Sequence, residues 1–540
     1  MLEIVFYCPA ARGVRLIWKA HHMILKRGAV TRRSHPRVIL AVVFALLVAT
    51  ATTSFPAAEA ATSPRQPAAA IATAATAADP TVTGPVTGGN GAIVLTSTAF
   101  ALSSVGYEQS EYFLSGTAKS YTSAGALAAD GEWSVTPTTT APYTTRVVVY
   151  RPQSAAKFNG TVVVEWLNDS ADLDVAAAWV ATHDELIRDG FAWVGVSAQQ
   201  VGVDELKTAD PVRYAALSHP GDSYSYDIFS QAGHAVRDQS STILSGLVPH
   251  SVLAIGESQS AFRLTTYADA VQPLVNVYGG FLLYSREGTS AALSQSPQAA
   301  VNAPSVVLIR PDLKVPVLAV ETETDLIPLD YYAARQPDST DFRDWEAAGT
   351  AHADDYISEL GFVDTGNGQG DIEAFDSMLD PPTTPDPAEP VVTCALPINT
   401  GETHYVVEAA VYALSLWATF GVAPIPAPRL DIDISAGTTP AFVLDADGNA
   451  EGGIRTPAVD VPVATLSGLG QSGTSFCFLF GTTTTFSAAK LAALYPTHAQ
   501  FVAEWTRDTA FDALEGYLRP ADAVNLITAA QDSTVGQLRQ

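Results

Sequence analysis

Short apolar runs alternate with amphipathic stretches along most of the chain, from residue 91 onwards. The run over 161–167 is apolar at almost every position, as in strands that are buried on both faces of a sheet. Other strands are predicted over 92–95, 146–150, 191–196, 252–255, 275–283, 315–320 and 342–346. Helical periodicity is present over 176–187, 227–244 and 403–420. Strands that alternate with helices predict an α/β fold, in which helices cover both faces of a mostly parallel sheet.

Two additions to this core are predicted. Gly-, Asp- and Pro-rich sequence indicates a loop insertion over 361–403. Residues 430–540 are expected to form a C-terminal extension that begins with a β-hairpin and continues with helices. The hairpin strands are predicted over 441–444 and 459–465, and two or three helices over 488–530. We therefore expect residues 91–540 to form a single decorated domain.

The N-terminus has the parts of a secretory signal peptide. A basic region precedes the uncharged apolar residues 38–51, and Ala58-Glu59-Ala60 offers a small-x-small cleavage site. The apolar run is short for a transmembrane helix. We predict a signal peptide over 1–60, with cleavage after Ala60, secretion, and no membrane anchor afterwards. The start codon stays open between Met1 and Met23, and the export route between the general and the twin-arginine pathway.

Residues 61–90 are rich in Ala, Thr and Pro and have no periodicity, so they are predicted to be a disordered linker. Acidic residues outnumber basic ones throughout the chain, 56 to 29, for a net charge of −27 at pH 7. Such a charge repels a phosphate backbone, so a nucleic-acid partner is excluded.

Two cysteines, Cys394 and Cys477, remain after removal of the predicted signal peptide, and export favours a disulfide between them. No cysteine or histidine spacing is typical of metal ligands, so no metal is expected. Residues 445–451 place oxygen ligands at alternate positions, as a calcium loop does, but Gly448 is misplaced and no closing Glu follows. An Asp-Gly hairpin turn explains that segment better.

A candidate nucleophile is Ser258, in a Gly-Glu-Ser-Gln-Ser motif. A β-prone run precedes the motif and an apolar-periodic segment follows it, which is the strand, turn and helix order of a nucleophile elbow. So tight a turn requires small residues two positions away on each side, and Gly256 and Ser260 meet that requirement. Two similar motifs, centred on Ser223 and Ser290, lack the strand before or the helix after.

A serine nucleophile needs an adjacent base that is itself oriented by an acid. In a sheet of this kind the chain order is Ser, acid, His. The strand over 315–320 ends in a loop with three carboxylates, of which Asp325 is the predicted acid and Glu323 the alternative.

The predicted base is His352, which follows the strand over 342–346 through a turn at Gly349. His404, at the start of the helix over 403–420, is the alternative. Four histidines precede Ser258 and are excluded by the chain order, and one is expected at the surface of the C-terminal region; these are His183, His219, His234, His250 and His498.

The oxyanion formed at an attacked carbonyl needs backbone N–H donors. One is expected at Gln259, directly after the nucleophile. The other is expected in the turn after 161–167, at Asn168 or Asp169, although the Gly-rich form of this turn is missing.

These blocks together resemble bacterial exported α/β-hydrolase domain-containing proteins, most of them uncharacterised serine hydrolases. The shared blocks are 160–168, 256–260, 321–325, 349–354 and 453–457, and the resemblance spans about 90–530. It implies an α/β-hydrolase fold with Ser258 and His352 in the family's positions, and leaves the acid open between Asp325 and Glu323. The helix end at 416–424 is also similar to the closing helix of tannase and feruloyl-esterase-like enzymes, which implies an ester substrate.

The expected function is that of an exported serine hydrolase that cleaves a carboxylic ester, without a cofactor. Two alternatives stay open. An amidase or lactonase would use the same triad. An extracellular binding protein on a hydrolase fold would fit Ser260 in place of the usual glycine. The identity of the substrate, the presence of a lid and the oligomeric state stay open as well.

Overall fold

The computed structural model describes residues 79–385, 392–435, 437 and 440–537, together with the backbone of two short strands near the N-terminus. These strands, β1 (Val5–Phe6) and β2 (Leu16–Ile17), pair antiparallel. Apart from them, the signal peptide predicted over 1–60 and the linker up to residue 78 fall outside the described residues, and both stay predictions. Residues 75–540 form one compact unit, which contains all the elements below.

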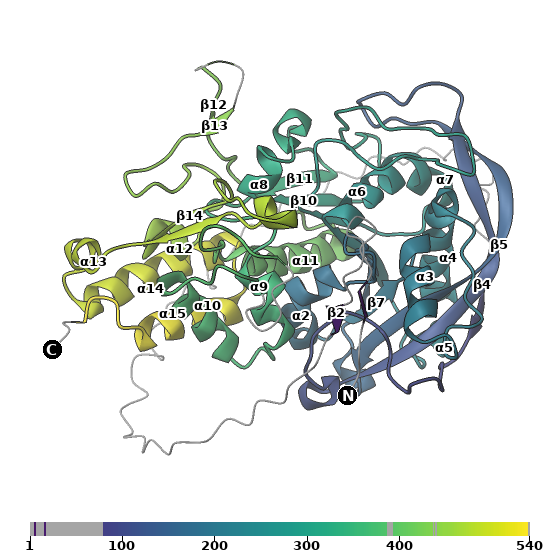
Figure 1. Cartoon of the computed structure of the whole chain (residues 1–540), viewed down its shortest axis with the longest axis horizontal. Helices are drawn as coiled ribbons and strands as arrows, with labels where there is room; N and C mark the ends of the chain where they lie inside the picture. The colour runs from purple at the N-terminus through teal and green to yellow at the C-terminus, as the bar shows by residue number, and fades with distance from the viewer. Residues whose placement is uncertain are drawn as a thin grey trace, which may run out of the picture. The chain divides into compact units, whose positions relative to one another are not determined.

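Nine strands in the described part of this unit form one sheet, in the spatial order β11-β10-β9-β8-β6-β7-β5-β4-β3 (Figure 1). Six of them are parallel: β6 (Thr161–Trp166), β7 (Ala192–Val196), β8 (Ser251–Glu257), β9 (Phe281–Tyr284), β10 (Val317–Glu321) and β11 (Phe342–Glu346). The antiparallel strands are β3 (Thr81–Thr83), β4 (Tyr107–Ser123) and β5 (Val135–Pro152). The predicted α/β fold with a mostly parallel sheet is confirmed.

Helices cover both faces of the sheet, because successive strand side chains point to opposite sides. Val162 and Val164 pack into the cluster on one face, and Val163 between them packs into the cluster on the other. The helices are α4 (Ser225–Asp238) and α6 (Gln259–Thr266) on the first face, and α2 (Ala177–Arg188) and α11 (Thr403–Phe420) on the second. Each fully buried valine contributes about 1.5–2 kcal/mol, which explains the unbroken apolar run.

Shorter helices connect the strands: α3 (Gln200–Ala209), α5 (Ser240–Ile243), α7 (Gln272–Val275), α8 (Glu323–Leu326) and α9 (Asp355–Ser358). The helix predicted over 227–244 is interrupted between α4 and α5. Of the strand predicted over 275–283, only the last residues are extended. Val275 belongs to α7, and β9 begins at Phe281. The predicted strand over 92–95 is irregular, and the Arg146 guanidinium binds the carbonyl of Val94 at 2.8 Å.

The linker predicted over 61–90 ends before residue 81, which corrects its boundary. Residues 81–83 form β3, and Val82 pairs with Leu114 of β4 and packs against the core. Gln239 also holds this segment, because its side-chain amide donates to the carbonyl of Pro80 at 2.8 Å. The Thr- and Pro-rich composition concealed a short edge strand, whose order comes from partners far away in the sequence.

The insertion over 361–403 is not only a loop, because it contains α10 (Gln369–Leu379). Phe375 and Met378 of α10 are buried against Trp505, in a cluster formed mostly by the C-terminal extension. All of the Pro residues and most of the Gly residues that suggested a loop lie outside this helix, which contains Gly370. Tertiary burial of two apolar side chains, three positions apart, therefore decides the conformation of this segment.

The hairpin predicted from 441–444 and 459–465 is wrong. Instead β13 (Ala441–Phe442) pairs with β12 (Ile432–Asp433), and β14 (Ala464–Ser467) pairs with β15 (Thr482–Thr485). Between them, Pro457 opens a short helix, α12 (Pro457–Asp460), as proline favours at a first helical position. The helices predicted over 488–530 are present as α13 (Ala488–Leu494), α14 (His498–Glu515) and α15 (Pro520–Asp532).

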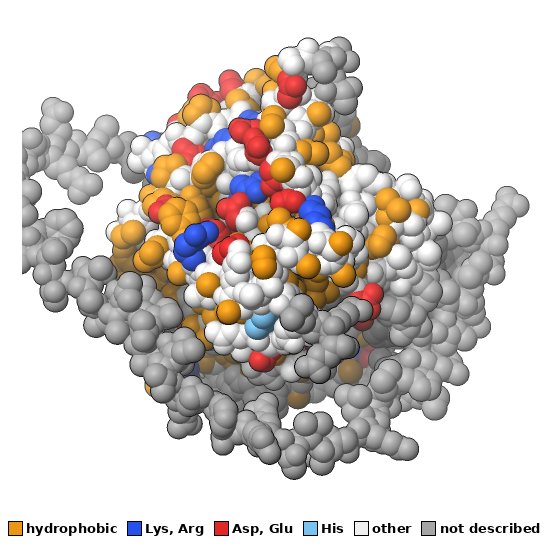
Figure 2. Space-filling view, turned by 90° about the vertical axis from the view of Figure 1, so that its left-hand side faces the viewer, with side chains coloured by type: hydrophobic (Ala, Val, Ile, Leu, Met, Phe, Trp, Pro, Cys, Tyr) orange, Lys and Arg blue, Asp and Glu red, His pale blue; other side chains and the backbone are white. Residues whose placement is uncertain are grey.

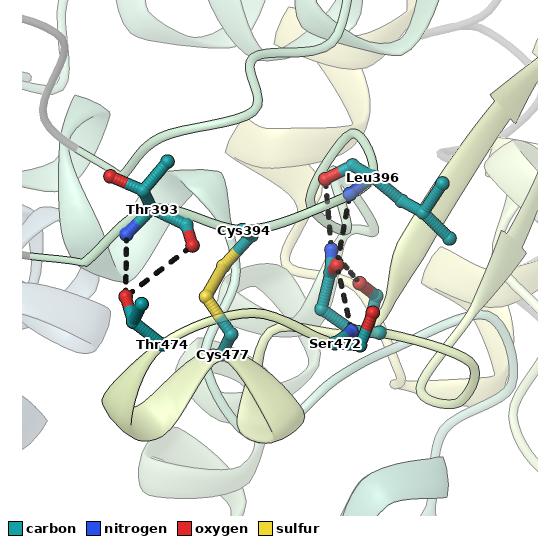
Figure 3. The surroundings of a disulfide bond; sticks show 8 residues. Thr393, Cys394, Leu396, Ser472, Thr474 and Cys477 are labelled. Carbon is teal, nitrogen blue, oxygen red and sulfur yellow. Dashed lines mark hydrogen bonds between the residues drawn. A yellow bond between two sulfur atoms is a disulfide. The ribbon is translucent and has the colours of Figure 1, made fainter.

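The predicted disulfide between Cys394 and Cys477 is present, with the two Cα atoms 5.4 Å apart (Figure 3). It joins the end of the insertion to the extension. In the described ranges, no helix has the length and apolarity that a membrane span requires. Figure 2 shows one face of the molecule, on which acidic and basic side chains lie among apolar ones, so this face presents no field of a single sign.

Buried carboxyls predict how stability depends on pH. Burial is the largest cause that raises the pKa of Glu165 to about 8, and the pKa values of Glu257 and Glu402 to about 7. In the unfolded chain such groups titrate near about 4.3. Between these values the folded state binds more protons than the unfolded chain, so the free energy of unfolding falls as pH rises.

We therefore expect the Tm to be higher at pH 5 than at pH 8, by at least about 2 °C. Differential scanning calorimetry in buffers of equal ionic strength measures this difference. A Tm that is constant or rises over that interval would contradict the assignment of raised pKa values to these carboxyls. Glu257→Gln, which removes one such group and keeps a hydrogen-bond acceptor, should reduce the slope.

Candidate active site

Ser258 lies in the sharp turn between β8 and α6, with φ 55° and ψ −122°. Its backbone is held at both ends, because its N–H donates to the carbonyl of Tyr284 at 2.9 Å and its carbonyl accepts from the N–H of Phe262 at 3.0 Å. A Cβ at position 256 would lie 2.8 Å from the carbonyl carbon of Ser260, so only glycine fits there. Ser260 itself is buried and fits the second small position. The predicted strand, sharp turn and helix around Ser258 are present.

His352 connects the other two predicted residues. Its Nε2 lies 2.7 Å from Ser258 Oγ, and its Nδ1 lies 2.6 Å from Asp325 Oδ1. The three side chains follow the carboxyl ends of β8, β10 and β11, which are neighbouring or next-neighbouring strands on the same half of the sheet. The structure thus brings Ser258, His352 and Asp325 into one hydrogen-bonded row.

Asp325 is oriented by the start of α8. The backbone N–H and the hydroxyl of Thr322 both donate to Asp325 Oδ2 at 2.7 Å, and the Thr322 hydroxyl accepts from the Asp325 N–H in return. One carboxylate oxygen is therefore bound to the capping residue, which leaves the other for His352 Nδ1. The Thr-x-x-Asp spacing at 322–325 is the sequence signal of this cap.

Glu323, the alternative acid, faces away from His352. Its carboxylate accepts from the N–H groups of Gly349 at 2.7 Å and Gly468 at 2.9 Å, and from the Ser467 hydroxyl at 3.2 Å. Glu323 thus joins three segments: its own loop, the turn that leads to His352, and the end of β14. Burial, the largest cause, raises its pKa to about 7. The alternative that Glu323 is the acid partner of His352 is therefore wrong. Glu323 instead connects the three segments.

His404, the alternative base, lies at the start of α11 with its ring stacked on Tyr356 at a centroid distance of 3.6 Å. Burial, followed by the charge of His183, lowers the pKa of His404 to about 3, so the ring stays neutral. Ser258 Oγ pairs with His352 instead. This alternative is wrong because α11 packs beneath the sheet, with its first turn in the protein interior.

A second carboxyl, Glu257, lies beside the reacting edge of His352. Its Oε1 is 3.8 Å from His352 Nε2, and its Oε2 accepts from the side-chain amide of Asn168 at 2.9 Å. Burial is the largest cause that raises the pKa of Glu257 to about 7. Glu257 stands in the nucleophile motif itself, but nothing in the sequence indicated that its side chain turns towards His352.

The pKa of His352 is raised above its ordinary value as the net result of opposing effects. Burial is the largest of them and lowers the pKa, but the charge of Asp325, the hydrogen bond with it, and the charges of Glu257 and Glu287 together outweigh burial. Because a nearby carboxylate stabilises the imidazolium form, this arrangement strengthens His352 as a base.

The turn after β6 differs from its prediction in one residue. The N–H of Asn168 donates to the carbonyl of Val175 at 2.9 Å, so it is not available to an oxyanion and that assignment is wrong. In the described part of the chain the N–H of the next residue, Asp169, has no acceptor. The N–H of Gln259 belongs to the first turn of α6, where amides have no partner within the helix. Gln259 and Asp169 are therefore two candidate amide donors, one directly after Ser258 and the other in the turn after β6.

Residues 445–451 form a turn, as interpreted from the sequence. The N–H of Asp445 donates to the carbonyl of Asn449 at 2.8 Å, and the Arg455 guanidinium binds the Asp445 carboxylate at 2.8 Å. One group of potential metal ligands lies elsewhere in the described residues, at Asp79, His234 and Asp238. The Arg237 guanidinium already lies 2.7 Å from His234 Nδ1 and 3.0 Å from Asp238 Oδ2, so a cation is present there without a metal.

Comparison with known proteins agrees with this architecture. Residues 82–528 match the family model described as "Alpha/beta hydrolase domain", over most of the chain. The chain belongs to this family. A comparison with curated proteins finds no match. Membership in the α/β hydrolase family supports a hydrolase.

Among solved structures, this α/β hydrolase is similar to a fungal esterase of Rhizomucor miehei, at 12% identity and a TM-score of 0.23 over 44% of this chain and 75% of that chain. It is also similar to the esterase domain of a Rhodothermus marinus protein, at 12% identity and a TM-score of 0.24 over 47% and 96%. A carboxylesterase of Lactobacillus plantarum WCFS1 matches at 9% identity and a TM-score of 0.24 over 40% and 76%. Scores this low add nothing on activity, and the assignment rests on the family match.

The contacts of Glu323 predict that its removal destabilises the α/β hydrolase. Glu323→Ala leaves the buried N–H groups of Gly349 and Gly468 without acceptors, which should cost about 2–3 kcal/mol of unfolding free energy. Urea denaturation measures this loss. Glu373→Ala, at an exposed position of α10, is the matched control and should change stability by less than about 0.5 kcal/mol. Equal effects of the two changes would contradict the connecting role.

Proposed function

We propose that the protein is a secreted serine hydrolase that cleaves carboxylic esters, with Ser258 as nucleophile, His352 as base and Asp325 as the orienting acid. The observation that carries the proposal is the continuous pair of hydrogen bonds from Asp325 through His352 to Ser258, at 2.6 and 2.7 Å. The positive φ of Ser258 adds support, because so strained a backbone persists where a function requires it. Ser258 is also half-buried, which leaves it accessible to a substrate.

In the first half of the reaction, Ser258 Oγ attacks the ester carbonyl carbon while its proton passes to His352 Nε2. The carbonyl oxygen becomes an oxyanion, for which the N–H groups of Gln259 and Asp169 are the proposed donors. When the tetrahedral intermediate collapses, the C–O bond to the alcohol breaks and His352 returns its proton to the departing alkoxide. An acyl group then remains on Ser258 Oγ.

In the second half, a water molecule attacks the acyl carbon and gives its proton to His352 Nε2. The bond to Ser258 Oγ breaks, Ser258 regains the proton from His352, and the carboxylic acid leaves. Asp325 stays ionised throughout and stabilises the imidazolium that forms twice in the cycle.

Secretion is part of the proposal. It is supported by the basic, apolar and small-residue parts of residues 1–60. The Cys394–Cys477 disulfide is compatible with an oxidising compartment.

A fluorophosphonate probe tests the nucleophile. We expect the probe to label Ser258 alone, as mapped by peptide mass spectrometry, and labelling to be lost in Ser258→Ala and His352→Ala. Ester turnover in both variants, and in Asp325→Asn, should fall by about a thousandfold or more, because the three groups act as a unit.

Two control variants match these changes. Ser290→Ala alters a serine in one of the similar motifs, and His250→Ala alters an exposed histidine, so both should keep labelling and turnover. If well-folded wild-type protein does not react with the probe, the extracellular binding protein becomes the better interpretation. A library that includes amides and lactones distinguishes ester cleavage from the two related activities.

The pH dependence of kcat/KM tests the electrostatics of the base. His352 must be neutral to accept the serine proton, and its pKa is raised, so kcat/KM should rise with pH through a midpoint above the ordinary histidine value of about 6.5.

In Glu257→Gln one of the charges that raise the pKa of His352 is lost, so the midpoint should move to lower pH. The charge of Glu287 also raises the pKa of His352, but by less than the charge of Glu257. Glu287→Gln should therefore move the midpoint in the same direction by a smaller amount. A midpoint that stays in place in Glu257→Gln would contradict the contribution of this carboxyl.

A further inference from the structure

Two segments near His352 form a surface without charged residues. Residues 471–486 contain no Asp, Glu, Lys or Arg, and neither do residues 392–401. Charged residues make up 16% of the whole chain, which has a net charge of −27. An uncharged surface of this length is therefore unusual within this protein, and it suits a neutral ligand better than an ionic one.

The two segments are tightly joined. The disulfide links Cys394 to Cys477, the N–H of Ala395 donates to the carbonyl of Ser472 at 2.8 Å, and the Gln471 side chain bonds both backbone groups of Leu396 (Figure 3). Gly473, with φ +140°, permits this close approach, because a Cβ there would lie 2.6 Å from the carbonyl oxygen of Thr393. The surface is thus held in one conformation before any ligand arrives.

This surface lies directly beside the proposed base. The N–H of Ala353, the residue after His352, donates to the carbonyl of Leu479 at 3.0 Å. On the other side of His352, a Cβ at Gly481 would lie 2.8 Å from the Cβ of Ala351. Both neighbours of His352 therefore contact the segment that contains the short 3-10 helix η7 (Ser475–Leu479).

Large apolar side chains project into solvent from this rigid surface. Phe476 and Phe478 are 45% and 49% exposed, on either side of the buried Cys477, and Leu396 across the disulfide is 45% exposed. We call these three side chains the apolar rim. Water-exposed aromatic groups on a fixed loop offer a ready apolar contact area, at little further cost in conformational entropy.

We propose that the apolar rim binds the hydrophobic part of the ester whose carbonyl Ser258 attacks, so that the enzyme prefers neutral esters with a large apolar group over short ones. The inference rests on the proposed function and names its substrate class. Three features favour an apolar ester group as the ligand of this surface. The surface is continuous with the His352 loop, it has no charged residues, and it exposes aromatic rings. An ionic ester finds no partner for its charge on such a surface, and a short ester offers it little apolar area to bury.

The test compares kcat/KM for p-nitrophenyl acetate and p-nitrophenyl octanoate. In the double variant Phe476→Ala/Phe478→Ala we expect kcat/KM to fall about tenfold for the octanoate and by less than about twofold for the acetate, because only the longer chain loses buried apolar area. Phe511→Ala is the matched control, since Phe511 is 58% exposed on α14, and it should leave the ratio unchanged. Thermal unfolding verifies that each variant is folded.

If the double variant is unstable, Leu396→Ala provides the same comparison, with a smaller fall for the octanoate. Equal losses for both esters would overturn the inference, because they would indicate a disturbed His352 loop. Unchanged kinetics would overturn it too, and a simultaneous change in sedimentation would then assign the rim to self-association. A wild-type protein that turns over neither ester would instead contradict the proposed function, and the inference with it.

Discussion

The backbone conformation of Ser258 is the constraint on which the site depends. A non-glycine residue at φ 55° and ψ −122° is strained by about 1–3 kcal/mol. The strain persists because β8 lies inside the sheet with neighbours on both sides, α6 packs on one face, and Gly256 leaves room for Ser260. The parallel register of β8, β9, β10 and β11 then places the loops after β10 and β11 on the same edge. Asp325 and His352 reach Ser258 because all three residues follow strands that end at this edge.

The C-terminal extension is part of the site, although it comes after all three of these residues in the chain. Glu323 binds the N–H groups of Gly349 and Gly468, and the side-chain amide of Asn399 donates to the carbonyl of Gly349 at 3.0 Å. The turn that leads to His352 is thereby connected to the insertion and to the extension. The disulfide then joins these two additions to each other. The additions thus hold His352 in place, besides providing a surface next to it.

Carboxyl groups have different roles in this protein according to how they are buried. The net charge of −27 suits a surface on which many carboxylates are exposed to water. Asp325 is buried with the N–H and hydroxyl of Thr322 and the ring of His352 around its carboxyl. Glu257 has Asn168 as its donor and a pKa raised by burial, so its charge changes near neutral pH beside the same histidine. Environment, not residue type, separates these roles.

The sequence alone predicted the α/β class, the sharp turn at Ser258 and the disulfide, and it favoured Asp325 over Glu323 and His352 over His404, because strand periodicity, turn chemistry and chain order are local or follow the order of the strands. Tertiary structure decided what depends on distant partners. Residues 81–83 became a strand by pairing with β4, and α10 formed around side chains that Trp505 buries. Asn168 lost its predicted role when its N–H bonded Val175, and Glu323 became a connector to Gly468, 145 residues away. Such contacts join residues far apart in the chain, and the hydrophobic periodicity of the sequence carries no information about them.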